Sequence, residues 1–350
     1  MGAIHSVATS FPEIYASQED IAKEIGSIWP DKQKHVEQFH SASKVQGRHL
    51  SIPLSEYKNL GDISDRSAKW LETALKLQTE NIEKLLTKAG LTPQDINLIV
   101  STTVTGLAIP TLEARLMNRL PFSPNTKRLP IFGLGCLGGV AGINRVNDYL
   151  KGHPKEAALL LATELCTLTF QFNDKSVANL VGTSLFADGA AAVLMVGDEH
   201  PLYKKSQFEI LTGESFFYPD TERIMGWDIV STGFQIVLSG DVPKIVVEQV
   251  KPNLDSFLSH NKITSSDVNF LVSHPGGPKV LDKLSEVSGK SPEDFRHSWN
   301  SLQEKGNMSS VSVLHVMEKT IQDNHKTNEI GLMLAMGPAF CSEMCLIKKL

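Results

Sequence analysis

The chain contains little that would suit a secreted, metal-binding or membrane-spanning protein. Its 350 residues include four cysteines, with no CxxC pair and no histidine–cysteine ligand spacing, which argues against a disulfide scaffold and a zinc site. No basic leader segment opens the sequence, and apolar runs such as residues 157–162 are too short to cross a bilayer. The net charge of −5 does not favour nucleic-acid binding. We therefore expect a cytoplasmic protein without a metal, a nucleic-acid partner or a membrane span.

One of the cysteines, Cys136, lies where a strand is expected to meet a helix. The apolar residues 129–132 predict a short buried strand, glycines around Cys136 predict a tight turn, and apolar residues at helical spacing follow. Backbone N–H groups and the helix dipole at such a position favour a thiolate. Gly135, Gly138 and Gly139 would let a bulky acyl group approach the sulfur. We interpret Cys136 as a nucleophile, with a buried structural cysteine as the alternative.

Two further polar residues lie at predicted element ends. Residues 269–274 predict a strand that ends in His274 and is followed by a Pro-Gly-Gly loop, while Asn307 comes just before an apolar-periodic helix. Catalytic groups are commonly mounted on loops at such ends. A single histidine at the end of a strand is more often a core residue whose hydrogen bonds are made within the protein. The order of Cys136, His274 and Asn307, each with its glycine-containing motif, indicates one catalytic site.

The sequence contains a trace of internal duplication. Residues 92–101 resemble residues 264–273, and the same offset places Cys136 within one residue of Asn307. This long period indicates two similar α/β halves rather than a solenoid of short repeats. Two halves related by a pseudo-twofold axis would bring Cys136 and Asn307 together at facing helix N-termini.

At this point the chain resembles the thiolase-fold condensing enzymes and, within them, the type III polyketide synthases related to chalcone synthase. The segments that carry the resemblance are 133–139, 163–170, 180–190, 274–277, 306–307 and 337–340. The resemblance covers essentially the whole chain. It departs from the plant pattern at residues 336–340, which read Met-Gly-Pro-Ala-Phe instead of Gly-Phe-Gly-Pro-Gly. Residues 164–166, 225–228 and 232–234 resemble the bacterial enzymes that make alkylpyrones or alkylresorcinols from fatty acyl-CoA.

The resemblance implies an α/β thiolase fold made of duplicated αβαβα layered halves with pseudo-twofold symmetry. We place the boundary near residue 200, so that residues 1–200 carry Cys136 and residues 201–350 carry the histidine and the asparagine. The family also implies a homodimer, in which Ile109 matches the position that reaches into the partner's chamber.

The chemistry implied by the resemblance is acyl transfer followed by decarboxylative condensation. Cys136 would take the acyl group of a starter acyl-CoA, with His274 pairing with the sulfur to favour thiolate and imidazolium. Malonyl-CoA would then lose carbon dioxide, and His274 and Asn307 would stabilise the enolate. The substrates are CoA thioesters, and no further cofactor is implied.

The remaining site residues follow from matched positions. Phe186 and Phe234 match gatekeeping aromatics, although Phe234 is equally well explained as a core residue. The positions that match the chamber lining are Thr105, Cys166, Thr169, Met225 and Gly226. The candidates for holding the CoA phosphates are Lys44, Arg48 and Lys279. Cys166 is the rival nucleophile, but no glycine-rich helix start follows it.

Three other functions remain open on the sequence. A ketoacyl-ACP synthase of the initiation type shares the same three catalytic residue types, and a hydroxymethylglutaryl-CoA-synthase-like enzyme would need a glutamate near the cysteine. A catalytically silent acyl-binding protein of the same fold would not need all three residues. We expect a long-chain fatty acyl-CoA starter, with alkylpyrones as products and alkylresorcinols as a second class. The number of extensions and the type of ring closure do not follow from the sequence.

Overall fold

Two turns of the same design begin matching strands in the two halves of the chain. In the computed structural model, which describes all 350 residues, the hydroxyl and N–H of Thr92 both donate to the carboxylate of Asp95 at 2.7 Å. Thr264 makes the same two bonds to Asp267, at 2.6 and 2.8 Å. Each pair is a capping box, which satisfies backbone donors at the start of a helical turn. The similarity between residues 92–101 and 264–273 therefore corresponds to equal local structure.

The strands confirm the duplication. They are β1 (Gly2–Ser10), β2 (Ile14–Ser17), β3 (Gly47–Leu50), β4 (Ile96–Thr103), β5 (Lys127–Phe132), β6 (Ala157–Leu165), β7 (Asp188–Gly197), β8 (Phe208–Phe217), β9 (Met225–Val230), β10 (Gly233–Leu238), β11 (Val268–Ser273), β12 (Ile330–Gly337) and β13 (Cys341–Lys349). Nine of them form one mixed sheet in the order β11-β12-β13-β8-β1-β7-β6-β4-β5. In each half, from the centre of the sheet toward its edge, the first two pairs of neighbouring strands are antiparallel and the next pair is parallel. Within the sheet, the halves meet through only two residue pairs between β1 and β8.

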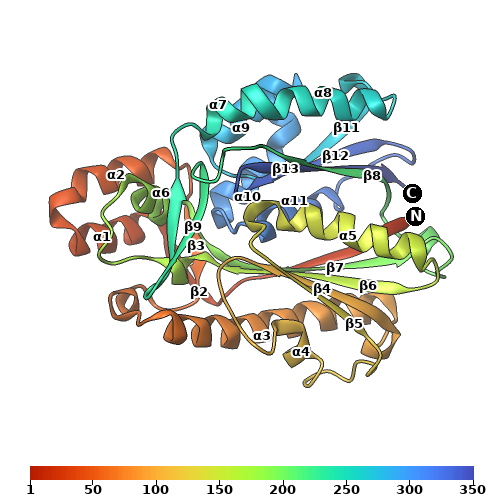
Figure 1. Ribbon diagram of the computed structural model, residues 1–350, viewed down its shortest axis with the longest axis horizontal. Helices are drawn as coiled ribbons and strands as arrows, with labels where there is room; N and C mark the ends of the chain where they lie inside the picture. Colours follow the sequence, from red (N-terminus) through yellow and green to blue (C-terminus); the bar gives the residue numbers. More distant parts are fainter.

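The helices complete a layered structure. They are α1 (Gln18–Ile28), α2 (Gln33–Ala42), α3 (Ile63–Ala89), α4 (Leu112–Leu116), α5 (Gly138–Gly152), α6 (Val177–Leu185), α7 (Val242–Ile245), α8 (Lys251–His260), α9 (Pro278–Ser288), α10 (Arg296–Lys305) and α11 (Ser310–Thr320). Figure 1 shows α5 and α11 in the middle, between the strands of the two halves, with α3 and α4 below and α7, α8 and α9 above. This is the predicted α/β arrangement of five layers.

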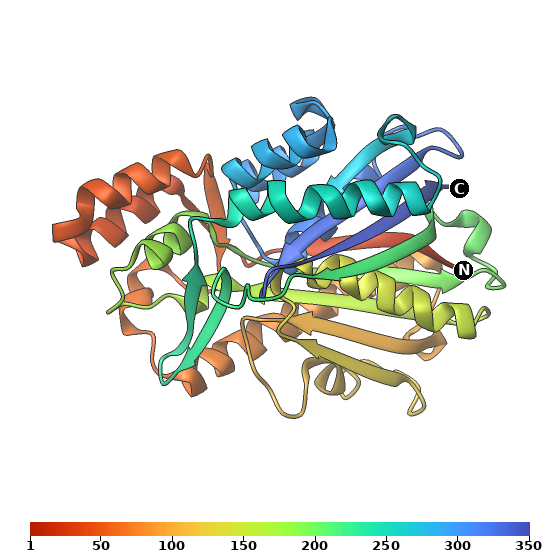
Figure 2. The same ribbon diagram turned by 45° about the horizontal axis from the view of Figure 1, so that its top comes forward.

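The two central helices are buried almost all round, as a helix between two sheet faces must be. Every residue from Ser310 to Met317 is buried, and most of α5 is as well. Figure 2, which turns the top of the molecule forward, shows α8 crossing in front of the upper strands and both chain ends at the same end of the molecule. No helix combines the length and apolarity that a membrane crossing requires.

One strand differs from the prediction. The run at residues 129–132 was expected to be buried, but β5 is the edge strand and is largely exposed, with Leu129 and Phe132 showing 43% and 48% of their surface. It pairs with β4 alone, so one side of its backbone faces outward. Because an edge strand packs on one neighbour only, its apolar sequence does not ensure burial.

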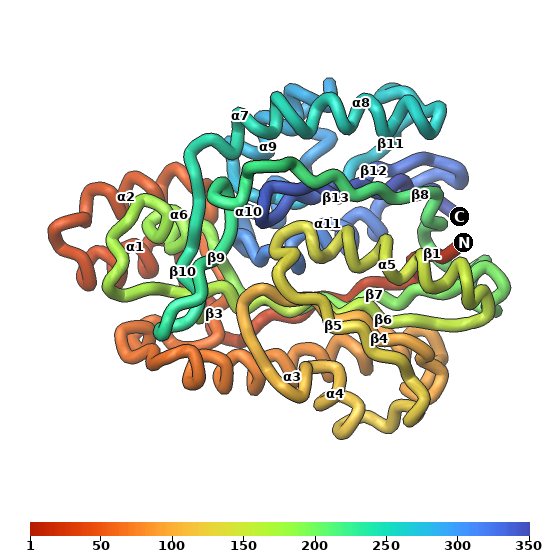
Figure 3. Tube along the Cα trace, viewed as in Figure 1, coloured from red at the N-terminus to blue at the C-terminus, as the bar shows by residue number.

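A smaller part of the chain lies to one side of the layers. Helices α1, α2 and α6 gather beyond the β9–β10 hairpin, as Figure 3 shows at the left end of the molecule, and the short β2–β3 pair contacts α1. Helix α2 packs on α6 and on α1. This side region borders the open ends of the central helices, where the candidate site lies.

Candidate active site

The three predicted catalytic residues line one cavity of about 380 Å³. Cys136 lies in a short 3₁₀ turn, Gly135–Leu137, directly before α5. His274 follows β11, and Asn307 lies between α10 and α11. The site thus forms where the N-terminal ends of the two central helices face the β9–β10 hairpin and α2, whose residues also line the cavity.

The turn that carries Cys136 depends on glycine. Gly133 and Gly135 have φ angles of 94° and 52°, a region that residues with a side chain rarely adopt. A side chain at Gly135 would also lie 2.6 Å from the ring of Pro338. The strand of β5 can therefore turn sharply into α5 and leave Cys136 at the bend.

The glycines after Cys136 have a different role from the one predicted. A side chain at Gly138 would meet the Thr102 hydroxyl at 2.5 Å, and one at Gly139 would meet the carbonyl of Ser310 at 2.5 Å. These glycines let α5 approach β4 and α11, so they do not provide space for an acyl group. The close packing instead fixes Cys136 relative to the start of α11.

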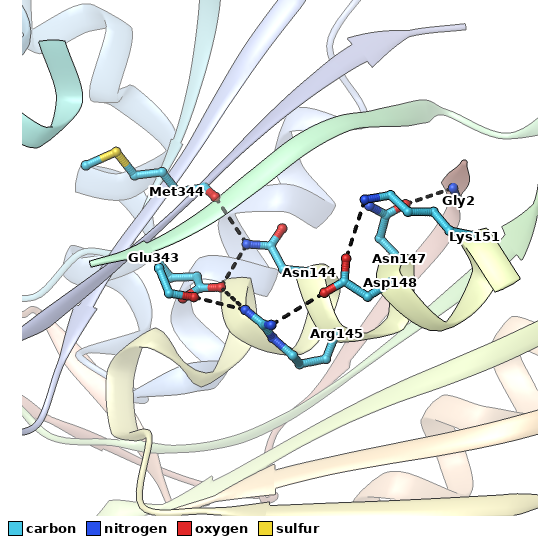
Figure 4. A network of polar contacts seen from close by, with 9 residues as sticks. Gly2, Asn144, Arg145, Asn147, Asp148, Lys151, Glu343 and Met344 are labelled. Atoms are coloured by element: carbon cyan, nitrogen blue, oxygen red, sulfur yellow. Dashed lines mark hydrogen bonds and ion pairs between the residues drawn. The ribbon is translucent and has the colours of Figure 1, made fainter. Parts of the chain in front are cut away.

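Polar contacts along α5 hold the helix in place, as Figure 4 shows. The Asn144 amide donates to the Glu343 carboxylate at 2.9 Å and to the Met344 carbonyl at 3.1 Å. Arg145 also reaches Glu343, at 3.1 Å. Near the other end, the side chain of Asn147 accepts the N–H of Gly2 at 2.8 Å. The helix that follows Cys136 is therefore tied to strands of both halves.

The surroundings of Cys136 favour the protonated thiol when no ligand is bound, because burial raises the pKa of the sulfur. The residue keeps some surface toward the cavity, yet burial, reinforced by the nearby Glu164 carboxylate, raises the pKa of its thiol to about 12. A hydrogen bond with the Ser309 hydroxyl opposes this rise. Desolvation has the largest effect on this pKa, because burial penalises the charged form of the sulfur.

His274 is buried and neutral. Its side chain is 2% exposed, and neither ring nitrogen has a hydrogen-bond partner in the protein. Burial lowers the pKa of the imidazole to about 3, so an imidazolium paired with a thiolate is not the resting state. Both nitrogens are left for a substrate in the cavity.

Asn307 is held in one orientation by its neighbours. Its side-chain oxygen accepts the N–H of Ser309 at 2.9 Å, and its amide nitrogen donates to the carbonyl of Gly276 at 3.1 Å, in the loop after His274. The backbone of Asn307 also pairs with residues 185–187, through bonds of 2.7 and 2.9 Å. The amide nitrogen retains a second hydrogen, which is the one available to a ligand.

A second, narrower cavity of about 60 Å³ adjoins the first. The two cavities share Cys166, Phe186, Trp227 and Ile236 in their walls. Phe186 lies against Trp227, with ring centroids 5.8 Å apart, and stands at the junction. Thr169 lines the narrower cavity, and Met225 and Gly226 line the larger one. Phe186 therefore lines both spaces, and its role as a gate stays a prediction.

The other cysteines are buried or packed. Burial raises the pKa of Cys166 well above its ordinary value, and its side chain is 2% exposed. Cys345 is fully buried in β13, and the Cys341 thiol donates to the carbonyl of Pro338 at 3.0 Å. Cys341 and Cys345 do not line either cavity.

Three predicted site residues do not line the cavity that holds Cys136. The hydroxyl of Thr105 donates to Glu164 at 2.8 Å behind the cavity wall and lines neither cavity. Phe234 is 4% exposed and packs against Phe132 beside a separate groove. Arg48 is 1% exposed, and its guanidinium donates to the carbonyls of Phe186 and Thr183 at 2.7 Å and to Gln18 at 2.6 Å. An arginine buried to this extent cannot meet a CoA phosphate at the surface.

The two lysines are exposed near the larger cavity. Lys279 lines its mouth in the first turn of α9, and Lys44 follows the lining residue Ser43. Of the three basic candidates, these two have a charge that solvent and ligands can reach.

The sequence did not single out several residues that build the site. Glu164 is fully buried, and Ser309 lines the larger cavity and donates its N–H to the side chain of Asn307. Trp227 and the lining residues of α2 were also missed. Glu164 and Trp227 belong to segments that carried the family resemblance, but a single sequence gives no sign of which way their side chains point.

Comparisons with known proteins agree with this geometry. Residues 49–212 match the family described as FAE1/type III polyketide synthase-like protein, and residues 209–350 match the C-terminal domain of chalcone and stilbene synthases. The chain is 38% identical over 350 residues to 1,3,6,8-tetrahydroxynaphthalene synthase of Streptomyces peucetius subsp. caesius, covering 99% of this chain and 93% of that one. It is 26% identical over 355 residues to the alpha-pyrone synthesis polyketide synthase-like Pks18 of Mycobacterium tuberculosis, covering 98% and 90%.

A solved structure shows the same fold over the whole chain. The crystal structure of 1,3,6,8-tetrahydroxynaphthalene synthase from Streptomyces coelicolor A3(2), a bacterial type III polyketide synthase, superposes with a TM-score of 0.93 at 28% identity and covers 99% of both chains. This confirms the predicted family, fold and enzyme class. With its duplicated layers and a cavity shared by cysteine, histidine and asparagine, the chain belongs to the type III polyketide synthase family, acyltransferases that condense CoA thioesters with decarboxylation.

Proposed function

We propose that this enzyme loads a long-chain fatty acyl-CoA on Cys136, extends it with malonyl-CoA and releases alkylpyrones, with alkylresorcinols as a second product class. The observation that carries the starter choice is the narrow cavity beside the catalytic one. Eleven of its 18 lining residues are hydrophobic, and three of them, Ile21, Ile25 and Ile28, come from one face of α1. An alkyl chain attached at Cys136 would find an apolar wall beyond Phe186.

The loading step uses the neutral forms of the two residues. His274 accepts the Cys136 proton as the sulfur attacks the thioester carbon, and donors in the cavity stabilise the oxyanion. The tetrahedral adduct then collapses, the acyl–sulfur bond to CoA breaks, and the departing thiolate takes the proton from His274. This leaves an acyl-enzyme and free CoA.

The extension step uses hydrogen-bond donors. Malonyl-CoA loses carbon dioxide, and the electron pair of the broken bond forms an enolate whose negative charge lies on the thioester oxygen. The N–H of His274 and the free amide hydrogen of Asn307 stabilise this oxygen. The enolate carbon attacks the acyl carbon on Cys136, and the sulfur leaves with the electron pair. Because neither nitrogen of His274 is bound to protein, it can supply an acceptor in one step and a donor in the next.

The CoA portion would lie at the mouth of the larger cavity. Lys279 and Lys44 offer exposed positive charges there, and CoA carries phosphates that such charges attract. We place the reaction in the cytoplasm, where acyl-CoA and malonyl-CoA would be met together, which fractionation of the source cells can test.

One experiment separates the candidate functions. Purified enzyme is incubated with radiolabelled malonyl-CoA and a series of fatty acyl-CoA starters, with coumaroyl-CoA as an aromatic competitor. The proposal expects labelled alkylpyrones whose mass follows the starter. A single extension on an acyl carrier protein would instead indicate a ketoacyl-ACP synthase, and binding without product would indicate a silent acyl-binding protein. Preference for coumaroyl-CoA would contradict the starter class.

A second candidate product deserves the same assay. The relative with 38% identity is named for 1,3,6,8-tetrahydroxynaphthalene, a ten-carbon aromatic that five two-carbon units could supply. The enzyme would then form this product from malonyl-CoA alone, without an acyl starter. Release of a ten-carbon aromatic in the control without starter would favour this function, whereas the apolar narrow cavity favours the alkyl starter.

We also propose that the enzyme is a homodimer. Ile109 is 95% exposed, and the edge strand β5 presents Leu129 and Phe132 at the surface. Apolar residues on an unpaired sheet edge are typical of surfaces that a second copy covers. Light scattering at micromolar concentration should give twice the monomer mass of 38.4 kDa. A monomer would contradict the proposal.

A further inference from the structure

The C-terminal end of α6 presents four backbone carbonyls to other parts of the chain. The last four carbonyls of an α-helix have no partner within the helix. In α6 they belong to residues 183–186, because the N–H of Phe186 still donates to the carbonyl of Gly182 at 2.9 Å. The last turn contains no basic side chain that could bind them. Their partners must therefore come from segments that are distant in the sequence.

Arg48 of β3 binds two of the four carbonyls. Its guanidinium donates to the carbonyls of Thr183 and Phe186, both at 2.7 Å, and to the side-chain oxygen of Gln18 at 2.6 Å. The amide of Gln18 in turn donates to the carbonyl of Ser184 at 2.8 Å. The Nε of Arg48 has no partner in the protein, so the two terminal nitrogens make all three bonds. This buried cation therefore lies at the negative end of the α6 dipole, where a positive charge is stabilising.

Asn307 binds the remaining carbonyl through its backbone. The N–H of Asn307 donates to the carbonyl of Leu185 at 2.7 Å, and the N–H of Ala187 donates to the carbonyl of Asn307 at 2.9 Å. These two bonds form a bridge between Asn307 and Phe186. Gly306 allows the close approach, since a side chain there would lie 2.9 Å from the carbonyl of Leu185. A shift of the end of α6 would therefore move the backbone of Asn307.

We propose that Arg48 is a positioning residue that acts through the end of α6 on Asn307 and on Phe186. Its planar guanidinium holds the carbonyls of residues 183 and 186 together, and the carbonyl that Asn307 binds lies between them in the sequence. Arg48 does not line the cavity that holds Cys136, so its effect on the enolate must pass through another residue. The inference rests on the proposed function, in which the amide of Asn307 stabilises the enolate of malonyl-CoA.

Arg66 of α3 provides a matched control. It is 6% exposed, and its guanidinium donates to the carbonyls of Gly61, Leu168 and Phe170 at 2.9, 2.7 and 2.7 Å. Removal of either arginine leaves buried carbonyls without donors, so Arg48→Met and Arg66→Met should both lower the melting temperature. Only Arg48 binds the end of α6. An effect on Asn307 should therefore follow from the first substitution and not from the second.

The test measures release of labelled carbon dioxide from malonyl-CoA without a starter, in Arg48→Met, Asn307→Ala and the double variant. Arg48→Met should lower kcat by about 10-fold to 100-fold, because a displacement of about 1 Å can cost about 100-fold in rate. In the Asn307→Ala background the same substitution should change kcat by less than about twofold, since the donor that Arg48 positions is already absent. Arg66→Met should have a small effect that is equal in both backgrounds.

A milder substitution keeps the test decisive if Arg48→Met fails to fold. Arg48→Lys retains the charge, but an ammonium group cannot fork to both carbonyls, so it should cost about threefold to tenfold in kcat and show the same dependence on Asn307. Wild-type kcat in the Arg48 variants, or an equal loss in both backgrounds, would overturn the inference alone. Wild-type decarboxylation in Asn307→Ala would contradict the enolate role in the proposed function and overturn this inference with it. The starter class does not enter, because the assay contains no starter.

Discussion

Replacing Thr169 by phenylalanine tests whether the narrow cavity holds the alkyl tail. Thr169 lies in its wall, is 6% exposed, and its hydroxyl donates to the carbonyl of Cys166 at 2.7 Å. An aromatic ring at this position would fill the space next to the junction at Phe186. Cys136 does not line this cavity, so its chemistry should be preserved.

The expected change in kcat/KM follows from the free energy of moving methylene groups from water to the apolar wall of the cavity. Each methylene moved from water into such a wall contributes about 0.8 kcal/mol, which is about a fourfold rise in kcat/KM per carbon. In the wild type kcat/KM should therefore rise with starter length until the cavity is filled. If the ring displaces four methylenes, about 3 kcal/mol is lost, and the longest starters should fall on the order of 100-fold while short starters change little.

The assay measures kcat/KM for saturated acyl-CoA starters of increasing length with wild type, Thr169→Phe and Val177→Phe. Val177 is 63% exposed on α6, outside both cavities, so it adds the same aromatic group where no tail can reach. Thermal unfolding of each variant shows whether the added ring destabilises the fold, as extra volume in a packed region often does. A flat wild-type profile, or equal profiles for the three proteins, would refute the tail cavity.

Three other predictions concern the catalytic residues and the buried histidines. Cys136→Ala should abolish acyl transfer from starter CoA while keeping the fold, and mass spectrometry should find the wild-type acyl group on the Cys136 peptide; finding it on Cys166 would reverse the assignment. His274→Ala and Asn307→Ala should each slow malonyl-CoA decarboxylation on the order of 10²–10³-fold, because each removes one donor to the enolate; wild-type rates in both would exclude that role. Burial lowers the pKa of His315 from 6.5 to about 3. At a pH between these two values, the histidine binds a proton in the unfolded chain but not in the folded protein. The contribution of this residue to the free energy of unfolding should therefore be full above pH 6.5 and fall by about 1.4 kcal/mol per pH unit below it. Urea unfolding at pH 7 and 5.5 should show that His315→Gln loses less free energy of unfolding between the two pH values than the wild type does. An equal loss in the two proteins would contradict the assignment.

The fold could be predicted far into its details because local signals and family motifs agreed. The repeated Thr-x-x-Asp turns before β4 and β11 revealed two halves, and the structure gives both turns the same capping box. The strand–turn–helix pattern around Cys136 also has the predicted form. These features depend on residues within a few positions of one another, which is the range over which a sequence constrains its own backbone.

Burial and charge state could not be predicted from the same residues. Arg48 was a plausible phosphate ligand by its charge, but it lies against carbonyls contributed by residues more than 130 positions away. The thiolate expected at Cys136 follows from the helix start alone, whereas the pKa of the sulfur is raised by enclosure in the fold and by the Glu164 carboxylate. Likewise, Gly138 and Gly139 were assigned to substrate space, although their neighbours belong to β4 and α11.

The crossing of α5 and α11 at the centre of the molecule bears on how such an enzyme could arise. Two identical half-length chains pairing about a twofold axis would present the same residue at both helix starts. Joining the halves into one polypeptide removes that constraint, since mutation can then alter one copy alone. In the proposed function, the turn before α5 carries the nucleophile, while the turn before α11 carries a hydrogen-bond donor. Covalent fusion is thus what permits an asymmetric pair of catalytic groups on a symmetric scaffold.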